Sequence, residues 1–165
     1  MPNKLTLILF LFINLIFTQA VLASETNKKE ANKKIEYLLS LSEAPTGVIF
    51  EIVTGSNNSL QWALPKTQQY IKKLRTRFPA LEIAIVTHGD EQFALKTSNN
   101  KKFKKVHSLT QQLVAEDNVP LHVCGTYASW RNVSEEEFPD YVDVTAAGPA
   151  TINDYIALGY TLIKL

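Results

Sequence analysis

Cys124 is the only cysteine of the 165-residue chain, and it lies in the segment HVCGTYASW at residues 122–130. An apolar, strand-like run precedes it, and a glycine and a helix-like stretch follow it. A thiol at this junction lies near the unpaired N–H groups and the positive end of the helix dipole, which favour the nucleophilic thiolate. A cysteine that serves only as a small buried apolar side chain suits the same position. The residues alone leave both interpretations open.

The three histidines differ in their relation to Cys124. His122 lies two residues upstream and shares a sheet face with the cysteine, where it either stabilises a thiolate or packs with a backbone partner of its own. His88 ends an apolar segment and precedes Gly89, which is the better place for a side chain that faces a ligand. His107 lies in a helix-like segment and is expected at the surface.

Several well-known catalytic motifs are absent from the sequence. It contains no C-x-x-C pair, no G-x-S-x-G elbow, no Walker loop and no G-x-G-x-x-G. One cysteine and three scattered histidines form a poor zinc site, so we expect neither a metal nor a cofactor. The segment TGSNNS at residues 54–59 offers hydroxyls and amides as a phosphate loop would, but chain architecture alone does not imply a flavin.

The first 23 residues have the composition of a secretory signal peptide. Lys4 supplies a basic start, an apolar run extends from Leu5 to Phe17, and Val21-Leu22-Ala23 predicts cleavage before Ser24. An uncleaved anchor is the alternative, but it would place polar side chains in the bilayer. We therefore expect a periplasmic or secreted protein, with residues 1–23 removed and no stable membrane insertion afterwards.

The mature chain that this cleavage produces has no formal net charge. Removal of Lys4 leaves 16 basic against 16 acidic side chains. Nucleic acids are usually bound by a basic face, so we exclude them as partners. The lone thiol cannot form an internal disulfide, and in an oxidising compartment it is a liability unless it is buried or used.

Strand-like and helix-like segments alternate along the remainder of the chain. Residues 24–45 are predicted to form a polar, mobile leader with a short helix at Ile35–Leu41, and residues 46–165 a single domain. The alternation predicts an α/β fold with a five-stranded, mostly parallel sheet of the doubly wound, flavodoxin-like type, whose ligands bind beyond the carboxyl ends of the strands. The expected strands are 48–53, 81–86, 120–124, 142–145 and 160–164, and the expected helices are 60–78, 105–117, 126–131 and 149–158.

Four segments of this domain, taken in order, have the character of a known family. They are ALPKTQQYIKKL at residues 63–74, IAIVTHGDEQFAL at 83–95, VPLHVCGTYASWRNVSEEEF at 119–138 and VDVTAAGPATINDYIALGYTLIKL at 142–165. The single Cys-Gly after an apolar strand and the closing Gly-Tyr strand are the most specific features. With them, the chain from Val48 to Leu165 resembles the DsrE/DsrF-like proteins of bacterial sulfur metabolism.

The resemblance implies a three-layer α/β sandwich that assembles into homo-oligomers or hetero-oligomers. In active members of the family, a lone cysteine at the position of Cys124 is thought to carry a persulfide and to pass sulfur to a partner protein. His88-Gly89 matches the family's His-Gly after the second strand, in the same site region. We therefore expect Cys124 to be the catalytic residue of a sulfurtransferase or sulfur carrier, with His88 shaping the pocket. The amides of Gly125 and Thr126 are expected to stabilise the sulfur anion.

Tyr127 and Trp130 depart from the small polar residues that usually follow Cys-Gly in the family. These two side chains are expected to narrow the site or to face a neighbouring subunit. The alternative function is a non-catalytic module of the same fold that binds a small ligand or a protein, in which Cys124 is structural. The aromatic pair favours this alternative.

Overall fold

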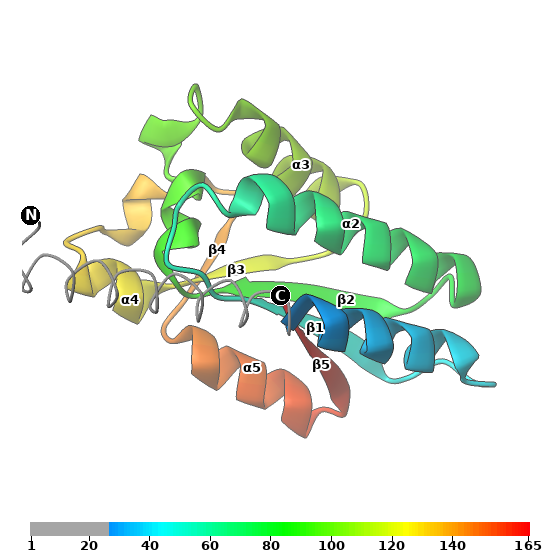
Figure 1. Cartoon of the computed structure of the whole chain (residues 1–165). Coiled ribbons are helices and arrows are strands. Elements are labelled where there is room, and N and C mark those ends of the chain that lie inside the picture. Colours follow the sequence, from blue (N-terminus) through cyan, green and yellow to red (C-terminus); the bar gives the residue numbers. More distant parts are fainter. Residues whose placement is uncertain (1–26) are drawn as a thin grey trace, which may run out of the picture.

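Residues 27–165 are described by the computed structural model of the chain, which Figure 1 shows. The predicted signal peptide, residues 1–23, and its cleavage site lie outside the described residues. Five strands form one sheet in the order β4-β3-β2-β1-β5, and every neighbouring pair is parallel. The predicted α/β class is confirmed, and the sheet is parallel throughout. The strands are β1 (Gly47–Ile52), β2 (Glu82–Thr87), β3 (Leu121–Cys124), β4 (Asp143–Thr145) and β5 (Tyr160–Lys164).

The helices lie where helical spacing of apolar residues predicts them. The start of the first one agrees with the prediction, and the other ends differ from it by one or two residues. Three short 3₁₀ helices were not predicted, because such short turns carry no apolar repeat that a pattern could reveal. The helices are α2 (Leu60–Arg77), α3 (Lys104–Ala115), α4 (Gly125–Trp130) and α5 (Gly148–Ala157), and the 3₁₀ helices are η1 (Asp90–Leu95), η2 (Thr97–Asn99) and η3 (Glu135–Glu137).

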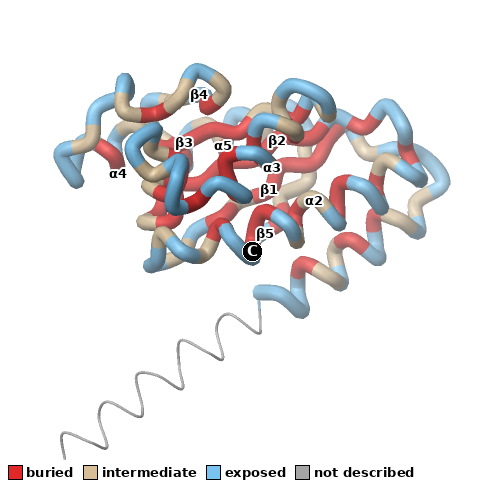
Figure 2. The backbone as a smooth tube through the Cα atoms, turned by 90° about the horizontal axis from the view of Figure 1, so that it is seen from above, coloured by how far each residue is buried: buried red, intermediate tan, exposed pale blue. Residues whose placement is uncertain are grey.

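Helices cover the two faces of the sheet unequally. The helical segment 27–40, α2 and α3 lie over one face, and α5 lies over the other (Figure 1). The first face carries the larger core, to which β1 contributes Val48, Phe50 and Ile52, all fully buried. The α5 face has a smaller buried cluster of Ile49, Ala84, Val86 and Ile152. In Figure 2 the buried positions follow the strands and the inward sides of the helices.

The segment before β1 belongs to the folded domain. Residues 27–40 are helical, and Ala31, Ile35 and Leu38 are 1–2% exposed on the larger core. Their spacing of three or four residues places them on one side of the helix. This differs from the mobile leader expected before Ile35. Ala31 is the only apolar residue between positions 27 and 34, so the sequence pattern does not reveal this part of the helix.

His107 is buried, which contradicts the expectation of a surface position. It is 2% exposed on α3, and its Nε2 lies 2.9 Å from the carbonyl oxygen of Ala94. Its Nδ1 is paired with the hydroxyl of Tyr141. Burial lowers the pKa of His107 below its ordinary value of 6.5, although the hydrogen bond to Ala94 acts in the opposite direction. The neutral ring is therefore the folded form near pH 7.

The substitution His107→Gln should make stability less dependent on pH. Because the pKa of His107 is lowered by folding, the unfolded chain binds more protons than the folded chain between the folded pKa and 6.5. The contribution of His107 to stability is therefore complete above pH 6.5 and is lost as the pH falls toward the folded pKa. Urea unfolding on both sides of pH 6.5 measures this, and equal pH slopes for wild type and variant would contradict the prediction.

Candidate functional site

Cys124 lies where the chain changes from one face of the sheet to the other. It is the last residue of β3, and the following helix α4 packs Ala128 into the larger core. The neighbouring strand β4 is followed by α5, which lies on the opposite face (Figure 1). Adjacent parallel strands whose connections diverge in this way form a crevice at their carboxyl ends, where such sheets bind ligands.

Gln92 holds the backbone of Cys124. The side-chain NH₂ of Gln92 donates to the Cys124 carbonyl at 3.2 Å, and its Oε1 accepts the Cys124 N–H at 2.9 Å. The carbonyl of Pro120, directly before β3, accepts a hydrogen bond from the N–H of Ile85 on β2. Every second residue from there, Cys124 included, therefore directs its N–H and C=O toward β2. Since β2 ends at Thr87, the carboxamide of Gln92 takes the place of the missing strand residue.

Glu91, the residue before Gln92, joins the ends of β1 and β2. Its carboxylate is fully buried and accepts four hydrogen bonds. The donors are the N–H and hydroxyl of Thr54 at 2.6 and 2.9 Å, the hydroxyl of Thr87 at 2.5 Å and the N–H of Gly89 at 2.7 Å. A Cβ on Gly89 would lie 2.6 Å from Glu91 Oε2 and 2.7 Å from the Thr54 carbonyl oxygen, so only glycine fits this position.

The sulfur of Cys124 accepts a hydrogen bond from the N–H of Tyr127 at 3.4 Å. The N–H and the hydroxyl of Thr126 both donate instead to the Ala146 carbonyl, at 3.0 and 2.7 Å. Gly125 packs against β4, where a Cβ would lie 3.1 Å from the Thr145 carbonyl oxygen. Of the amides near the sulfur, the one that bonds to it is therefore that of Tyr127, which the sequence did not single out. The cysteine itself is 4% exposed.

His88 lies beside Cys124. The β2–β3 register ends at the pair Thr87↔Val123, and His88 and Cys124 are the residues that directly follow the two members of this pair. Gly148, the first residue of α5, lies against both: a Cβ placed on it would be 2.7 Å from the His88 Cβ and 3.3 Å from the Cys124 Cβ. His88 Nε2 lies 2.9 Å from Glu51 Oε1. The structure thus places His88 beside Cys124, whereas Gly89 lies against Glu91 and Thr54.

His122 has side-chain partners away from the sulfur. Its Nδ1 lies 2.6 Å from Asp143 Oδ2 on β4, and its Nε2 lies 3.1 Å from the hydroxyl of Tyr155 on α5. Burial raises the pKa of Tyr155, and the nearby carboxylates of Asp143 and Glu82 raise it further. The ring of His122 thereby joins β3, β4 and α5.

The aromatic pair of α4 is divided between the site and the surface. The Tyr127 hydroxyl donates to Asp90 Oδ1 at 2.7 Å, and its ring stacks on Phe93 with centroids 5.9 Å apart. Arg131 lies 3.0 Å from both the Tyr127 hydroxyl and Asp90 Oδ1. These contacts hold the Tyr127 side chain against η1, while Trp130 is 73% exposed.

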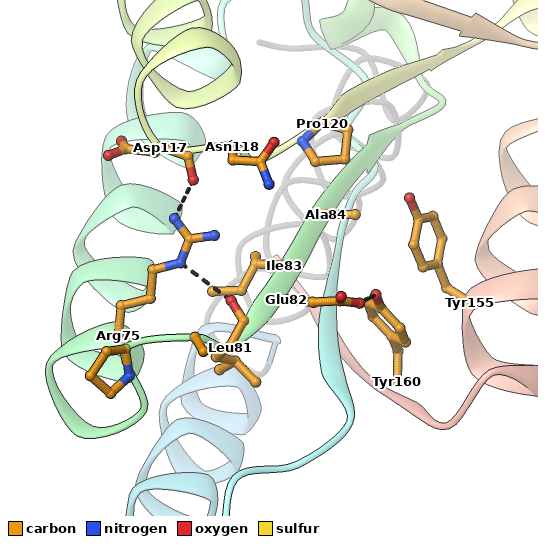
Figure 3. Close-up of a pocket in the computed structure, with 12 residues that line it drawn as sticks. Arg75, Leu81, Glu82, Ile83, Ala84, Asp117, Asn118, Pro120, Tyr155 and Tyr160 are labelled. Atoms are coloured by element: carbon orange, nitrogen blue, oxygen red, sulfur yellow. Dashed lines mark hydrogen bonds between the residues drawn. The ribbon is translucent and has the colours of Figure 1, made fainter.

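A cavity of about 550 Å³ lies at the other end of the sheet from Cys124 (Figure 3). Its walls include Leu81 and Glu82 at the start of β2, Pro120 before β3, and Tyr155 and Tyr160. The hydrogen bond to Glu82 raises the pKa of Tyr160 to about 12. Because all strands are parallel, this amino-terminal edge and the Cys124 edge are separate sites.

Two findings concern metals and membranes. Among residues 27–165, no group of three or more His, Cys, Asp and Glu side chains is arranged to hold a metal ion. In the same part of the chain, no helix has both the length and the apolar character needed to cross a bilayer.

Gln92, Glu91 and Glu51 are the candidate functional residues that the sequence reasoning missed. Glu91 and Gln92 end the short polar run 88–92, which separates a strand from the apolar residues 93–95, and this position near a strand end is the sequence signal that could have indicated them. Glu51 lies inside the strand-like run VIFEIV, where a charged side chain is unusual.

Comparisons with known proteins agree with this architecture. The family model described as the DsrE/DsrF-like family matches residues 20–165. The structure is similar to the protein of unknown function MTH1491 from Methanobacterium thermoautotrophicum, with 16% identity, TM-score 0.56, and coverage of 72% of this chain and 97% of that one. It is similar to the conserved protein of unknown function BT1422 from Bacteroides thetaiotaomicron, with 11% identity, TM-score 0.50, and coverage of 71% and 94%.

A third solved structure is the ychN protein from E. coli, with 16% identity, TM-score 0.46, and coverage of 72% of this chain and 99% of that one. At these identities the likeness to MTH1491 and BT1422 shows the fold alone. No curated protein matches the sequence.

The substitution Gln92→Met should destabilise the carboxyl edge of the sheet. It removes the carboxamide from a fully buried position and leaves the N–H and C=O of Cys124 without their partner. We expect the free energy of unfolding to fall by about 2 kcal/mol or more, the cost of orphaning buried backbone groups. The exposed Gln111 provides a matched control, and Gln111→Met should change stability by less than about 0.5 kcal/mol. Equal effects of the two variants in urea unfolding would contradict the role of Gln92.

Proposed function

Because the chain belongs to the DsrE/DsrF-like family, we propose that it is an exported sulfur-handling protein that carries sulfane sulfur as a persulfide on Cys124. The observation that carries the proposal is the position of this thiol. It is the last residue of β3, at the carboxyl edge of the sheet where the connections after β3 and β4 pass to opposite faces. Its sulfur accepts a hydrogen bond from the Tyr127 N–H at 3.4 Å. A backbone N–H aimed at the sulfur can donate to the negative charge that develops on it during sulfur transfer.

The proposed reaction is a balanced sulfur transfer. A small persulfide, R–S–SH, donates its outer sulfur to Cys124: the Sγ–S bond forms, the S–S bond of the donor breaks, and R–SH leaves with the thiol proton. An acceptor thiol then takes the sulfur from Cys124 in the same way. No oxidant, metal or cofactor enters either step, because one S–S bond replaces another.

The absence of a second cysteine supports a carrier role. Cys124 is the only thiol of the chain, so an internal thiol cannot attack its persulfide to form a disulfide. The persulfide therefore persists until an external acceptor arrives. Cys124 is only 4% exposed, so only small sulfur donors can reach it directly. The same low exposure protects the thiol from oxidation to sulfenic and higher acids.

Export and assembly are part of the proposal. The composition of residues 1–23 supports export to the periplasm or outside the cell. Only one ten-residue helix, α5, covers the second face of the sheet within the described residues. Near its end Ile156 and Leu158 are 42% and 67% exposed. Exposed apolar side chains beside a thinly covered sheet support a homo-oligomer.

A non-catalytic binding module of the same fold is the second candidate function. The observation that favours it is that Cys124 is buried and that both of its backbone polar groups are bound by Gln92. On this reading the cysteine fills space at the end of β3, and the edge of the sheet binds a small ligand or a partner loop.

Intact mass before and after treatment with a small persulfide tests the proposal. We expect the mature protein to gain the mass of one or more sulfur atoms, to lose it on reduction, and to gain none when Cys124→Ser is treated in parallel. We also expect Cys124 of the folded protein to react with an alkylating reagent faster than a free thiol does at neutral pH.

The opposite result supports the binding module. A folded protein whose mass does not change, and whose thiol reacts only after unfolding in urea, would make Cys124 a core residue. In that case Cys124→Ala should lower the free energy of unfolding by about 1 kcal/mol and leave the cellular role intact.

A further inference from the structure

Glu51 is a carboxylate on the inner part of the sheet face that also carries Cys124. It belongs to β1, where Val48, Phe50 and Ile52 face the larger core and Ile49 and Glu51 face α5. Its side chain is only 13% exposed. A carboxylate in such a place is costly unless it is paired, so its partners indicate its role.

The two carboxylate oxygens of Glu51 have different partners. Oε1 lies 2.9 Å from His88 Nε2, and Oε2 lies 3.0 Å from the ammonium of Lys164 on β5. The hydrogen bond from His88 lowers the pKa of Glu51 more than burial raises it, and Lys164 lowers it further. Glu51 is therefore ionised near neutral pH and is an acceptor only.

This contact determines which nitrogen of His88 carries the proton in the neutral ring. Because an ionised carboxylate only accepts, His88 Nε2 must be the N–H that donates to it. The lone pair of the neutral imidazole is then on Nδ1. Within residues 27–165 no hydrogen bond of the protein engages His88 Nδ1, so this nitrogen remains able to accept a proton.

The backbone places His88 within reach of Cys124. His88 follows Thr87, the last residue of β2, and Cys124 follows Val123, the partner of Thr87 on the adjacent strand β3. Adjacent strands of a sheet lie about 4.8 Å apart, so the two residues start close together. Their even positions direct both side chains to the α5 face. There, a Cβ on Gly148 would be 3.3 Å from both the His88 Cγ and the Cys124 Cβ, so the two side chains begin within twice that distance of each other.

We propose that Glu51 is a positioning residue for the chemistry of Cys124, and that it holds His88 as the Nε2–H tautomer so that Nδ1 accepts the thiol proton. The inference rests on the proposed function and names the proton acceptor that this function needs. As Sγ forms its bond to the outer sulfur of R–S–SH, Nδ1 takes the Sγ proton. The donor S–S bond breaks, and the departing thiolate receives that proton as R–SH.

Other charged groups near His88 are already paired. Lys164 from β5 balances Glu51, Asp143 from β4 lies against His122 of β3, and the carboxylate of Glu91 is saturated by its four donors. Asp154, the charged residue of α5, is exposed. Glu51 is therefore the one ionised group in hydrogen-bond contact with the His88 ring among the described residues.

The substitution Glu51→Gln tests the inference through two measurements. In this variant Lys164 can donate only to the oxygen of the new side-chain amide. The amide NH₂ should therefore turn to His88 and donate to Nε2. The proton of the neutral ring should then move from Nε2 to Nδ1. Long-range proton–nitrogen NMR spectra of the imidazole should show Nε2–H in wild type and Nδ1–H in the variant. The rate at which Cys124 gains sulfur from glutathione persulfide, followed by intact mass, should fall at least about tenfold, as expected when a proton acceptor is disabled.

A double-mutant cycle separates positioning from a general loss of structure. His88→Gln should slow sulfur loading by a similar factor, and the double variant Glu51→Gln/His88→Gln should be no slower than His88→Gln alone. Glu82→Gln is the matched control, because it makes the same change on the same sheet face at the other edge, and it should load within about twofold of wild type. If Glu51→Gln does not fold, Glu51→Asp retains the charge but withdraws it from His88, and it should also load at least about tenfold more slowly.

The outcomes distinguish this inference from the proposed function. A wild-type protein that gains no sulfur overturns the proposed function, and the inference with it. A wild type that loads sulfur while Glu51→Gln loads equally fast, or with additive effects in the double variant, overturns the role of Glu51 alone. An Nδ1–H tautomer in the wild type also overturns that role, because the lone pair would then face Glu51.

Discussion

The buried carboxylate of Glu91 is the interaction on which the carboxyl edge of the sheet depends. A fully buried carboxylate is tolerated only when hydrogen bonds fill its lone pairs, and here four donors do so. The donors belong to Thr54, Thr87 and Gly89, which are the residues that follow or end β1 and β2. One side chain therefore links the ends of both strands, and loss of any of its donors would destabilise both ends.

The 3₁₀ helix η1, which contains Glu91, also contacts Cys124. Asp90, Glu91 and Gln92 are consecutive residues of η1, and each reaches a different element: Tyr127 of α4, the ends of β1 and β2, and the backbone of Cys124. Successive side chains of a 3₁₀ helix point about 120° apart, so one turn can contact three neighbours. The position of the thiol thus depends on polar contacts at this edge as well as on the apolar packing of Val123 and Ala128 on either side of it.

The two faces of the sheet differ in the polarity of the side chains they bury. The face under α2 and α3 is apolar and holds most of the buried side chains. The face under α5 carries paired polar groups, Glu51 with His88 and His122 with Asp143, beside a small apolar cluster. Because the larger core supplies most of the burial, the second face can hold paired polar groups whose desolvation costs stability.

The order of the strands and helices, and the thiol at the end of the third strand, could be predicted from local sequence patterns. β-branched runs predicted five strands, and the helix expected from Thr126 begins one residue earlier, at Gly125, directly after the third strand. These features are local, since the alternation of apolar residues along a strand is visible in neighbouring positions. The surroundings of Cys124 could not be predicted in this way, because they depend on contacts between distant segments. Gln92 is 32 residues away from it, and Glu51 is 37 residues away from His88, so no local pattern links them. The burial of His107 and of Ala31 was decided in the same way, because a side chain is buried by the elements that pack against it and not by its own helix.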